Sequence, residues 1–112
     1  MLSGEGKNNL EKINKMIKKF WGDSCTSINE KFNDIPFDEF EVFVVLYNKI
    51  EIKITYDRSI IGFNIKKHGN FINLRNLTSQ KLFTGFESST EENIEHNFRV
   101  LDDELNKQFI EQ

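Results

Sequence analysis

Apolar residues occupy every second position along most of residues 39–75, and this alternation restricts the fold more than any other feature of the sequence. A period of two is typical of a β-strand, whose successive side chains point to opposite faces of a sheet. Short turns divide the alternation into four runs, at residues 40–47, 50–56, 61–66 and 71–75. Because short turns join strands that run in opposite directions, the sequence predicts a four-stranded antiparallel meander.

The first two runs differ in their second face. In the first run Phe43 and Val45 make both faces apolar, which predicts a strand that is covered on both sides. In the second run Glu51 and Lys53 alternate with isoleucines, which predicts one face in water. Gly69 lies in the turn before the fourth run, where a glycine can adopt a positive φ.

Helical spacing flanks the predicted sheet on both sides. Apolar residues three and four apart predict a helix at Leu10, Ile13, Ile17, Phe20 and Trp21. After Gly22 the spacing continues through Ile28 and Phe32, so residues 7–33 are predicted to be helical, as one helix or two. A capping box at Ser89 and Glu92 predicts a second helix over residues 89–110. The expected apolar face of this helix consists of Ile94, Phe98, Leu101, Leu105 and Phe109.

These elements predict an α+β fold, a two-layer sandwich of an N-terminal helical segment, a four-stranded antiparallel meander and a C-terminal helix. Residues 76–88 are expected to form a loop. The chain of 112 residues fits one domain, residues 1–112. Pro36 is the single proline, which argues against long proline-rich linkers between domains.

The chain is expected to be cytoplasmic. Cys25 is the single cysteine, so a disulfide within the chain is impossible and a reducing compartment fits best. The first residues lack the apolar segment of a secretory signal. No apolar run reaches the ~18 residues of a membrane-spanning helix, so we expect no membrane partner.

The net charge of -3 is distributed unevenly. Residues 1–33 carry 6 - 4 = +2, and residues 76–112 carry 3 - 8 = -5. Nucleic-acid binding usually requires a basic surface, so the overall charge argues against a nucleic-acid partner. The lysines of the first helix could meet an anionic surface, but a solvated helix face is the simpler interpretation.

The sequence offers no recognisable catalytic or metal-binding motif. A cysteine nucleophile needs a histidine nearby, and nothing in the sequence places His68 or His96 beside Cys25. One cysteine and two distant histidines do not match zinc spacing, and the acids near residue 38 lack the pattern of a calcium loop. We therefore expect no enzyme activity, no metal and no cofactor.

Acidic residues are the remaining functional candidates. One group crowds the approach to the first predicted strand, and a second lies in the middle of the last helix, where the helix dipole does not explain it. A negative surface attracts a basic protein and raises the rate of association. The candidate partner-binding residues are Asp34, Asp38, Glu39, Glu41, Asp102, Asp103 and Glu104.

In size, acidity and cysteine poverty the whole chain resembles the immunity proteins of contact-dependent growth inhibition and other polymorphic toxin systems of bacteria. The stretch FDEFEVFVVLY, from residue 37 to residue 47, and the acidic last helix are consistent with this resemblance. The resemblance implies a protein that binds and neutralises a cognate toxin, commonly a basic nuclease. Immunity proteins share no sequence signature, so the resemblance assigns no role to an individual residue.

A small acidic secretion chaperone, or a homodimeric protein-binding adaptor, is the alternative. Such a protein would use the open sheet face or the loop aromatics Phe83 and Phe86. Secretion chaperones usually have a helix among their strands, and none is predicted between residues 48 and 75. We therefore expect a monomer in the absence of the partner.

Overall fold

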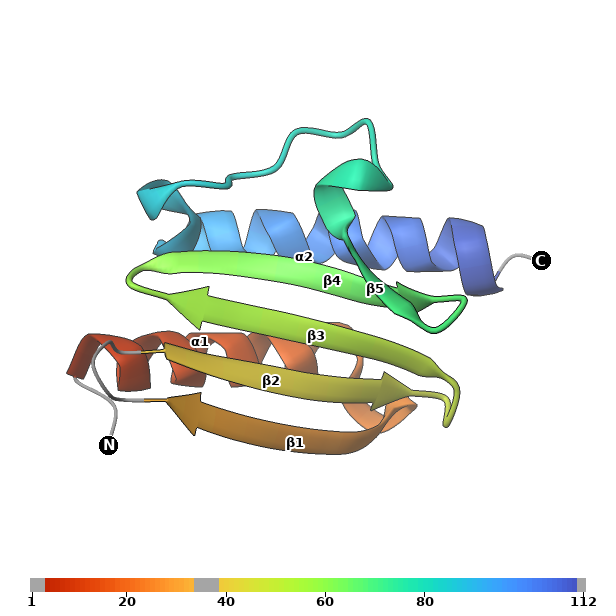
Figure 1. Cartoon of the computed structure of the whole chain (residues 1–112), viewed down its shortest axis with the longest axis horizontal. Coiled ribbons are helices and arrows are strands. Elements are labelled where there is room, and N and C mark those ends of the chain that lie inside the picture. The colour runs from red at the N-terminus through yellow and green to blue at the C-terminus, as the bar shows by residue number, and fades with distance from the viewer. Residues whose placement is uncertain (1–3, 34–38, 111–112) are drawn as a thin grey trace.

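A computed structural model describes residues 4–33 and 39–110. Helix α1 (Gly4–Phe20) comes first, and α2 (Glu91–Leu105) follows the sheet (Figure 1). Five strands lie between them: β1 (Cys25–Asn33), β2 (Glu39–Leu46), β3 (Ile50–Asp57), β4 (Ile60–Lys67) and β5 (Asn70–Asn73). The expected α+β fold is therefore present, with five strands where four were expected.

The sheet is an antiparallel meander in the order β1-β2-β3-β4-β5. Two-residue turns join β3 to β4 and β4 to β5, and both residues of each turn have positive φ. Such turns match the right-handed twist of the strands that they connect. Gly69 takes one of these positions, with φ 84°, as its place in the sequence predicted.

The prediction that residues 7–33 are helical was wrong in its second half. Gly22 has φ 47°, and only a short 3₁₀ turn (Gly22–Ser24) separates α1 from β1. Ile28 and Phe32 are four residues apart, a spacing that fits both one turn of helix and a period of two. Strand pairing decides the outcome, because β1 satisfies the backbone groups along the outer side of β2.

Both helices cover one face of the sheet, and the core lies between the two layers (Figure 1). Phe98 of α2 stands at the centre of an aromatic cluster. Its ring centroid lies 5.9 Å from that of Phe20, 5.3 Å from that of Trp21 and 5.2 Å from that of Phe63. The cluster therefore joins the end of α1, the sheet and α2.

The opposite face of the sheet, here called the open face, is covered by no helix among the described residues. The prediction that the first run is covered on both sides was therefore wrong for β2. Phe43 and Val45 are only half-buried, and neighbouring strands supply what cover they have. The Phe43 ring lies 6.4 Å from the ring of Phe71 on β5.

The two ends of α2 differ in part from the sequence prediction. Thr90, not Ser89, caps α2, because the Thr90 hydroxyl accepts a hydrogen bond from the Asn93 N–H at 3.3 Å. The chain after α2 continues as a short π-helix, Asn106–Ile110.

None of the described helices combines the length and the apolar character that crossing a membrane requires.

Candidate functional site

A groove of ≈ 280 Å³ lies where β1, β2 and β3 meet at one end of the open face. Its lining carries three carboxylates and one ammonium group, for a formal charge of 1 - 3 = -2. Phe32 of the edge strand β1 also lines the groove, although the strand register places its half-exposed ring on the helix side, opposite Phe40. We call this feature the acidic groove, and it is lined by Lys31, Phe32, Glu39, Phe40, Glu41, Thr55, Tyr56 and Asp57.

Strand register gathers the carboxylates of the acidic groove. Glu39 and Glu41 alternate with buried residues of β2, so both belong to the open face. Glu39 stands directly opposite Asp57 on β3. Like charges in opposite positions of neighbouring strands destabilise a sheet, by about 0.2–1 kcal/mol in typical cases. The pairing of Glu39 with Asp57 is therefore expected to lower the stability of the sheet.

Basic side chains compensate part of this charge. The Arg58 Nε donates to Asp57 at 2.8 Å, and the hydrogen bond and charge of Asp57 raise the pKa of the Arg58 guanidinium. The charge of Glu39 raises it further. Lys53 lies 3.9 Å from Glu41, with its ammonium also 4.8 Å from the centre of the Phe71 ring. The Arg58–Asp57 pair is exposed and the Lys53–Glu41 pair is partly exposed, so a basic partner would compete with weak, salt-screened contacts.

The predicted site residues do not form one surface. Glu39 and Glu41 lie together in the acidic groove, whereas Asp34 and Asp38 lie outside the described residues. The other three lie on α2, in the helical layer across the sheet. Asp57, which the sequence analysis did not single out, joins the groove. Counting outward from the turn between β2 and β3, where Leu46 pairs with Ile50, would have placed it opposite Glu39.

The three acids of α2 face different surroundings. Asp102 accepts a hydrogen bond from the Trp21 indole at 3.2 Å, and burial raises the pKa of its carboxyl. Glu104 is buried, with 6% of its surface exposed, and accepts from the Gln108 amide at 3.0 Å. Asp103 alone of the three is exposed. This part of α2 therefore presents one accessible carboxylate and not an acidic cluster.

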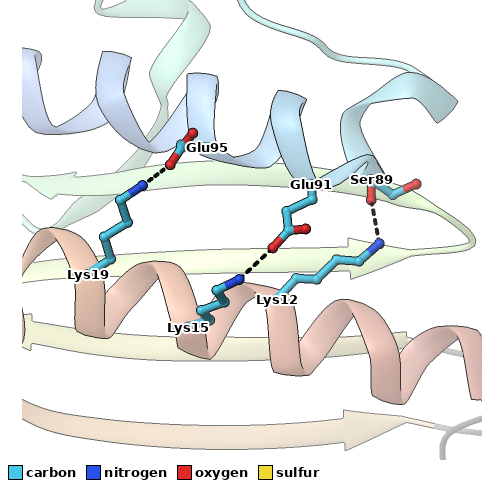
Figure 2. A network of polar contacts seen from close by, with 6 residues as sticks. All are labelled: Lys12, Lys15, Lys19, Ser89, Glu91 and Glu95. Carbon is cyan, nitrogen blue, oxygen red and sulfur yellow. Dashed lines mark hydrogen bonds and ion pairs between the residues drawn. The ribbon is translucent and has the colours of Figure 1, made fainter.

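Two lysines of α1 pair with acids of α2, and a third contacts the residue before Thr90, the N-cap of α2 (Figure 2). Lys15 pairs with Glu91 at 2.8 Å, and Lys19 pairs with Glu95. Lys12 donates to the Ser89 carbonyl oxygen at 3.4 Å, just before α2 begins. The basic first segment and the acidic last segment thus partly compensate each other within the helical layer.

The loop after β5 packs against α2 through a buried amide. Asn97 accepts from the Phe83 N–H at 3.1 Å and donates to the Phe83 carbonyl at 3.0 Å. His96 makes a 2.7 Å hydrogen bond with the Lys81 carbonyl oxygen through Nε2. A second hollow of ≈ 280 Å³ beside this loop contains one acid and one base, Asp57 and Arg75, so it has no net charge.

The cysteine and the histidines lie on separate elements. Cys25 begins β1, His68 lies in the turn between β4 and β5, and His96 belongs to α2. The strands β1 and β4 are three strand spacings apart, about 14 Å. Within residues 4–33 and 39–110, no group of three or more Cys, His, Asp or Glu side chains could hold a metal ion.

No family model, no curated protein and no solved structure matches this chain. The geometry of the acidic groove and of the strands around it is therefore the basis for the functional argument.

Proposed function

We propose that this protein is a cytoplasmic immunity protein, which binds a cognate protein toxin and blocks it through the acidic groove. The observation that carries the proposal is the grouping of Glu39, Glu41 and Asp57 around one hollow at the end of the open face. Charges of one sign that converge on a hollow attract a partner of the opposite sign and raise its rate of association.

The charge of the groove selects a basic partner. A Lys or Arg side chain that entered it would approach three carboxylates and would exchange its hydrating water for charge-assisted hydrogen bonds. Nuclease toxins carry basic surfaces because they bind a polyanion. A protein that covered such a surface would exclude the nucleic acid, so inhibition requires no chemistry from the inhibitor.

The test uses a toxin domain encoded beside the gene of this protein, measured by stopped-flow association at increasing salt. We expect a rate that falls with salt, because attraction between exposed charges is screened. In the pair of substitutions Glu39→Lys and Glu41→Lys the rate should fall by about ten-fold or more. Co-expression should also restore growth to cells that make the toxin.

A matched control separates the groove from the net charge. Glu11→Lys with Glu92→Lys makes the same change in net charge on exposed residues of α1 and α2. If the control slows association as much as the groove variant does, the acidic groove is not the contact. If no neighbouring toxin is bound or neutralised, the proposed function is wrong.

The homodimeric adaptor is favoured by one observation, the 72% exposure of the Phe86 side chain on the 3₁₀ helix Phe86–Ser89. Phe83, the other loop aromatic, packs against His96, with ring centroids 5.2 Å apart. Sedimentation distinguishes the two functions. A monomer at every concentration contradicts the adaptor, whereas a dimer that Phe86→Ser dissociates supports it.

A further inference from the structure

The two edges of the sheet differ in how well they are protected against pairing with a further strand. At the far edge β5 is four residues long, and beyond it the Ser88 hydroxyl accepts from the Ile61 N–H of β4 at 2.9 Å. At the near edge β1 runs for nine residues and pairs with β2 alone among the described strands. In an antiparallel strand every second residue directs its N–H and C=O away from a given neighbour. The outer side of β1 is therefore a row of backbone groups beside which no described strand lies, and such a row is a template for another strand.

Exposed apolar side chains accompany this row. Ile28 is 47% exposed and Phe32 is 50% exposed, although they stand opposite the buried residues Val44 and Phe40 of β2. Both belong to the face that the helices cover, but β1 lies at the border of that cover. A strand added to β1 would bring side chains beside Ile28 and Phe32 and would remove them from water.

Glu30 lies between these two apolar residues on the same face of β1. Its carboxylate accepts from the Asn14 amide at 3.3 Å, and it forms no ion pair with any residue that the structure describes. A charge in the middle of an edge strand is a common protection against pairing with a copy of the same strand. The antiparallel register that matches Ile28 with Phe32 of a second copy also places Glu30 opposite Glu30.

We propose that the outer edge of β1 accepts an extended segment of the toxin as a sixth strand. That segment carries a Lys or Arg opposite Glu30 and apolar side chains opposite Ile28 and Phe32. The proposal rests on the proposed function, and it assigns to the partner a strand with a basic centre. Two residues of β1, Lys31 and Phe32, line the acidic groove, so the groove extends to the edge strand.

The test uses the full chain and a short synthetic peptide, Thr-Leu-Thr-Lys-Thr-Leu-Thr, blocked at both ends. We expect the peptide to shift the NMR signals of β1 amides and to slow their hydrogen exchange, while the amides of β5 stay unchanged. A peptide with Glu in place of Lys should bind about two- to five-fold more weakly, as is typical of unfavourable cross-strand pairs. In Glu30→Lys this preference should reverse, a result that a structural role of Glu30 would not produce.

Three results would overturn the proposal: no response of β1 at millimolar peptide, a response elsewhere on the protein, or a preference that Glu30→Lys does not reverse. Ile28→Ser with Phe32→Ser, both at exposed positions, should weaken the peptide without unfolding the protein, which circular dichroism checks. A wild-type dimer that this variant dissociates would assign the edge to a second copy and would also contradict the proposal.

The peptide test is independent of toxin neutralisation. Binding of the peptide to β1 with no neutralised toxin would contradict the proposed function alone. Salt-dependent toxin binding without any response of β1 to the peptide would contradict the strand addition alone.

Discussion

Trp21 donates its indole N–H to the carboxylate of Asp102 at 3.2 Å, and this contact joins the end of α1 to α2. The same indole ring packs at 5.3 Å from Phe98, so one side chain contributes both to the core and to a polar contact at its border. Burial favours the neutral form of Asp102 and raises its pKa, against the opposing effect of the indole hydrogen bond. Asp102 was predicted as a partner-binding residue, and in the structure its carboxylate connects α2 to the end of α1 through the hydrogen bond with Trp21.

The pKa of Asp102 predicts a pH dependence of stability. Because the folded pKa lies above the ordinary value of 3.8, the folded state binds this proton more tightly than the unfolded state does. The contribution of Asp102 to the free energy of unfolding is therefore most favourable below that value and falls as the pH rises through the folded pKa. Asp102→Asn, which keeps an oxygen for the indole, should gain stability relative to the wild type as the pH rises from 3.8 through the folded pKa.

Urea unfolding of both proteins across this pH range measures the difference. Asp23→Asn is the matched control, because its carboxylate is exposed and is not among the groups that change the pKa of Asp102. A difference between Asp102→Asn and the wild type that stays constant with pH, or that shifts in the opposite direction, would contradict the raised pKa.

The ion pairs between the helices predict a charge-swap experiment. Lys15→Glu alone should destabilise the protein, because the new carboxylate would face that of Glu91, whereas Lys15→Glu with Glu91→Lys should recover most of the loss. The pair lowers the pKa of Glu91 below its ordinary value of 4.5, so its contribution is present above that pH and disappears as the pH falls through the folded pKa. Thermal unfolding in about 1 M salt, where the Debye length is about 3 Å, should abolish the recovery.

The swap has a control at a position outside the network that Figure 2 draws. Glu11 is exposed on α1, so Glu11→Lys changes charge without entering this network. If the double variant is no more stable than the sum of the two single effects predicts, Lys15 and Glu91 are not coupled.

The sequence predicted the sheet better than the helical layer or the site. Strands β2 to β5 were each visible in a period of two, because one face of each strand is buried and the turns between them are short. β1 was missed because an edge strand with Ile28 and Phe32 half-exposed has little burial to shape its sequence. Residues 25–33 form a strand because they pair with β2, and the sequence of residues 25–33 alone does not reveal this pairing.

In the candidate site, too, the sequence predicted what depends on local pattern and missed what depends on contacts between distant segments. Glu39 and Glu41 were recognised from local density of charge, and the register of β2 placed them in one groove. Asp57 and Phe32 were missed because their place in the groove depends on pairing between strands. Glu104 was misread as surface because α2 is covered on more than one side, which the helical period alone does not reveal.

Asn97 predicts a large effect for a small substitution. It is 1% exposed and satisfies both backbone groups of Phe83 in the loop before α2. Asn97→Ala should cost about 2–4 kcal/mol, because the loss leaves two backbone groups without partners and opens a space in the protein. Asn93→Ala, which removes one exposed hydrogen bond to the Glu87 carbonyl, should cost much less. Urea unfolding measures both, and equal losses would contradict the role of Asn97.

Gly22 predicts a test of how α1 ends. Its φ of 47° lies in the left-handed region, and a Cβ at this position would contact nothing within 4 Å, so the cost of a substitution is conformational and not steric. Gly22→Ala should therefore lower the free energy of unfolding by about 1 kcal/mol. Gly4→Ala is the matched control, because Gly4 also has open space around it but lies in α1 without a positive φ. The control should be neutral or stabilising, since alanine favours a helix. If both substitutions have the same effect on urea unfolding, a left-handed residue is not what ends α1 and directs the chain into β1.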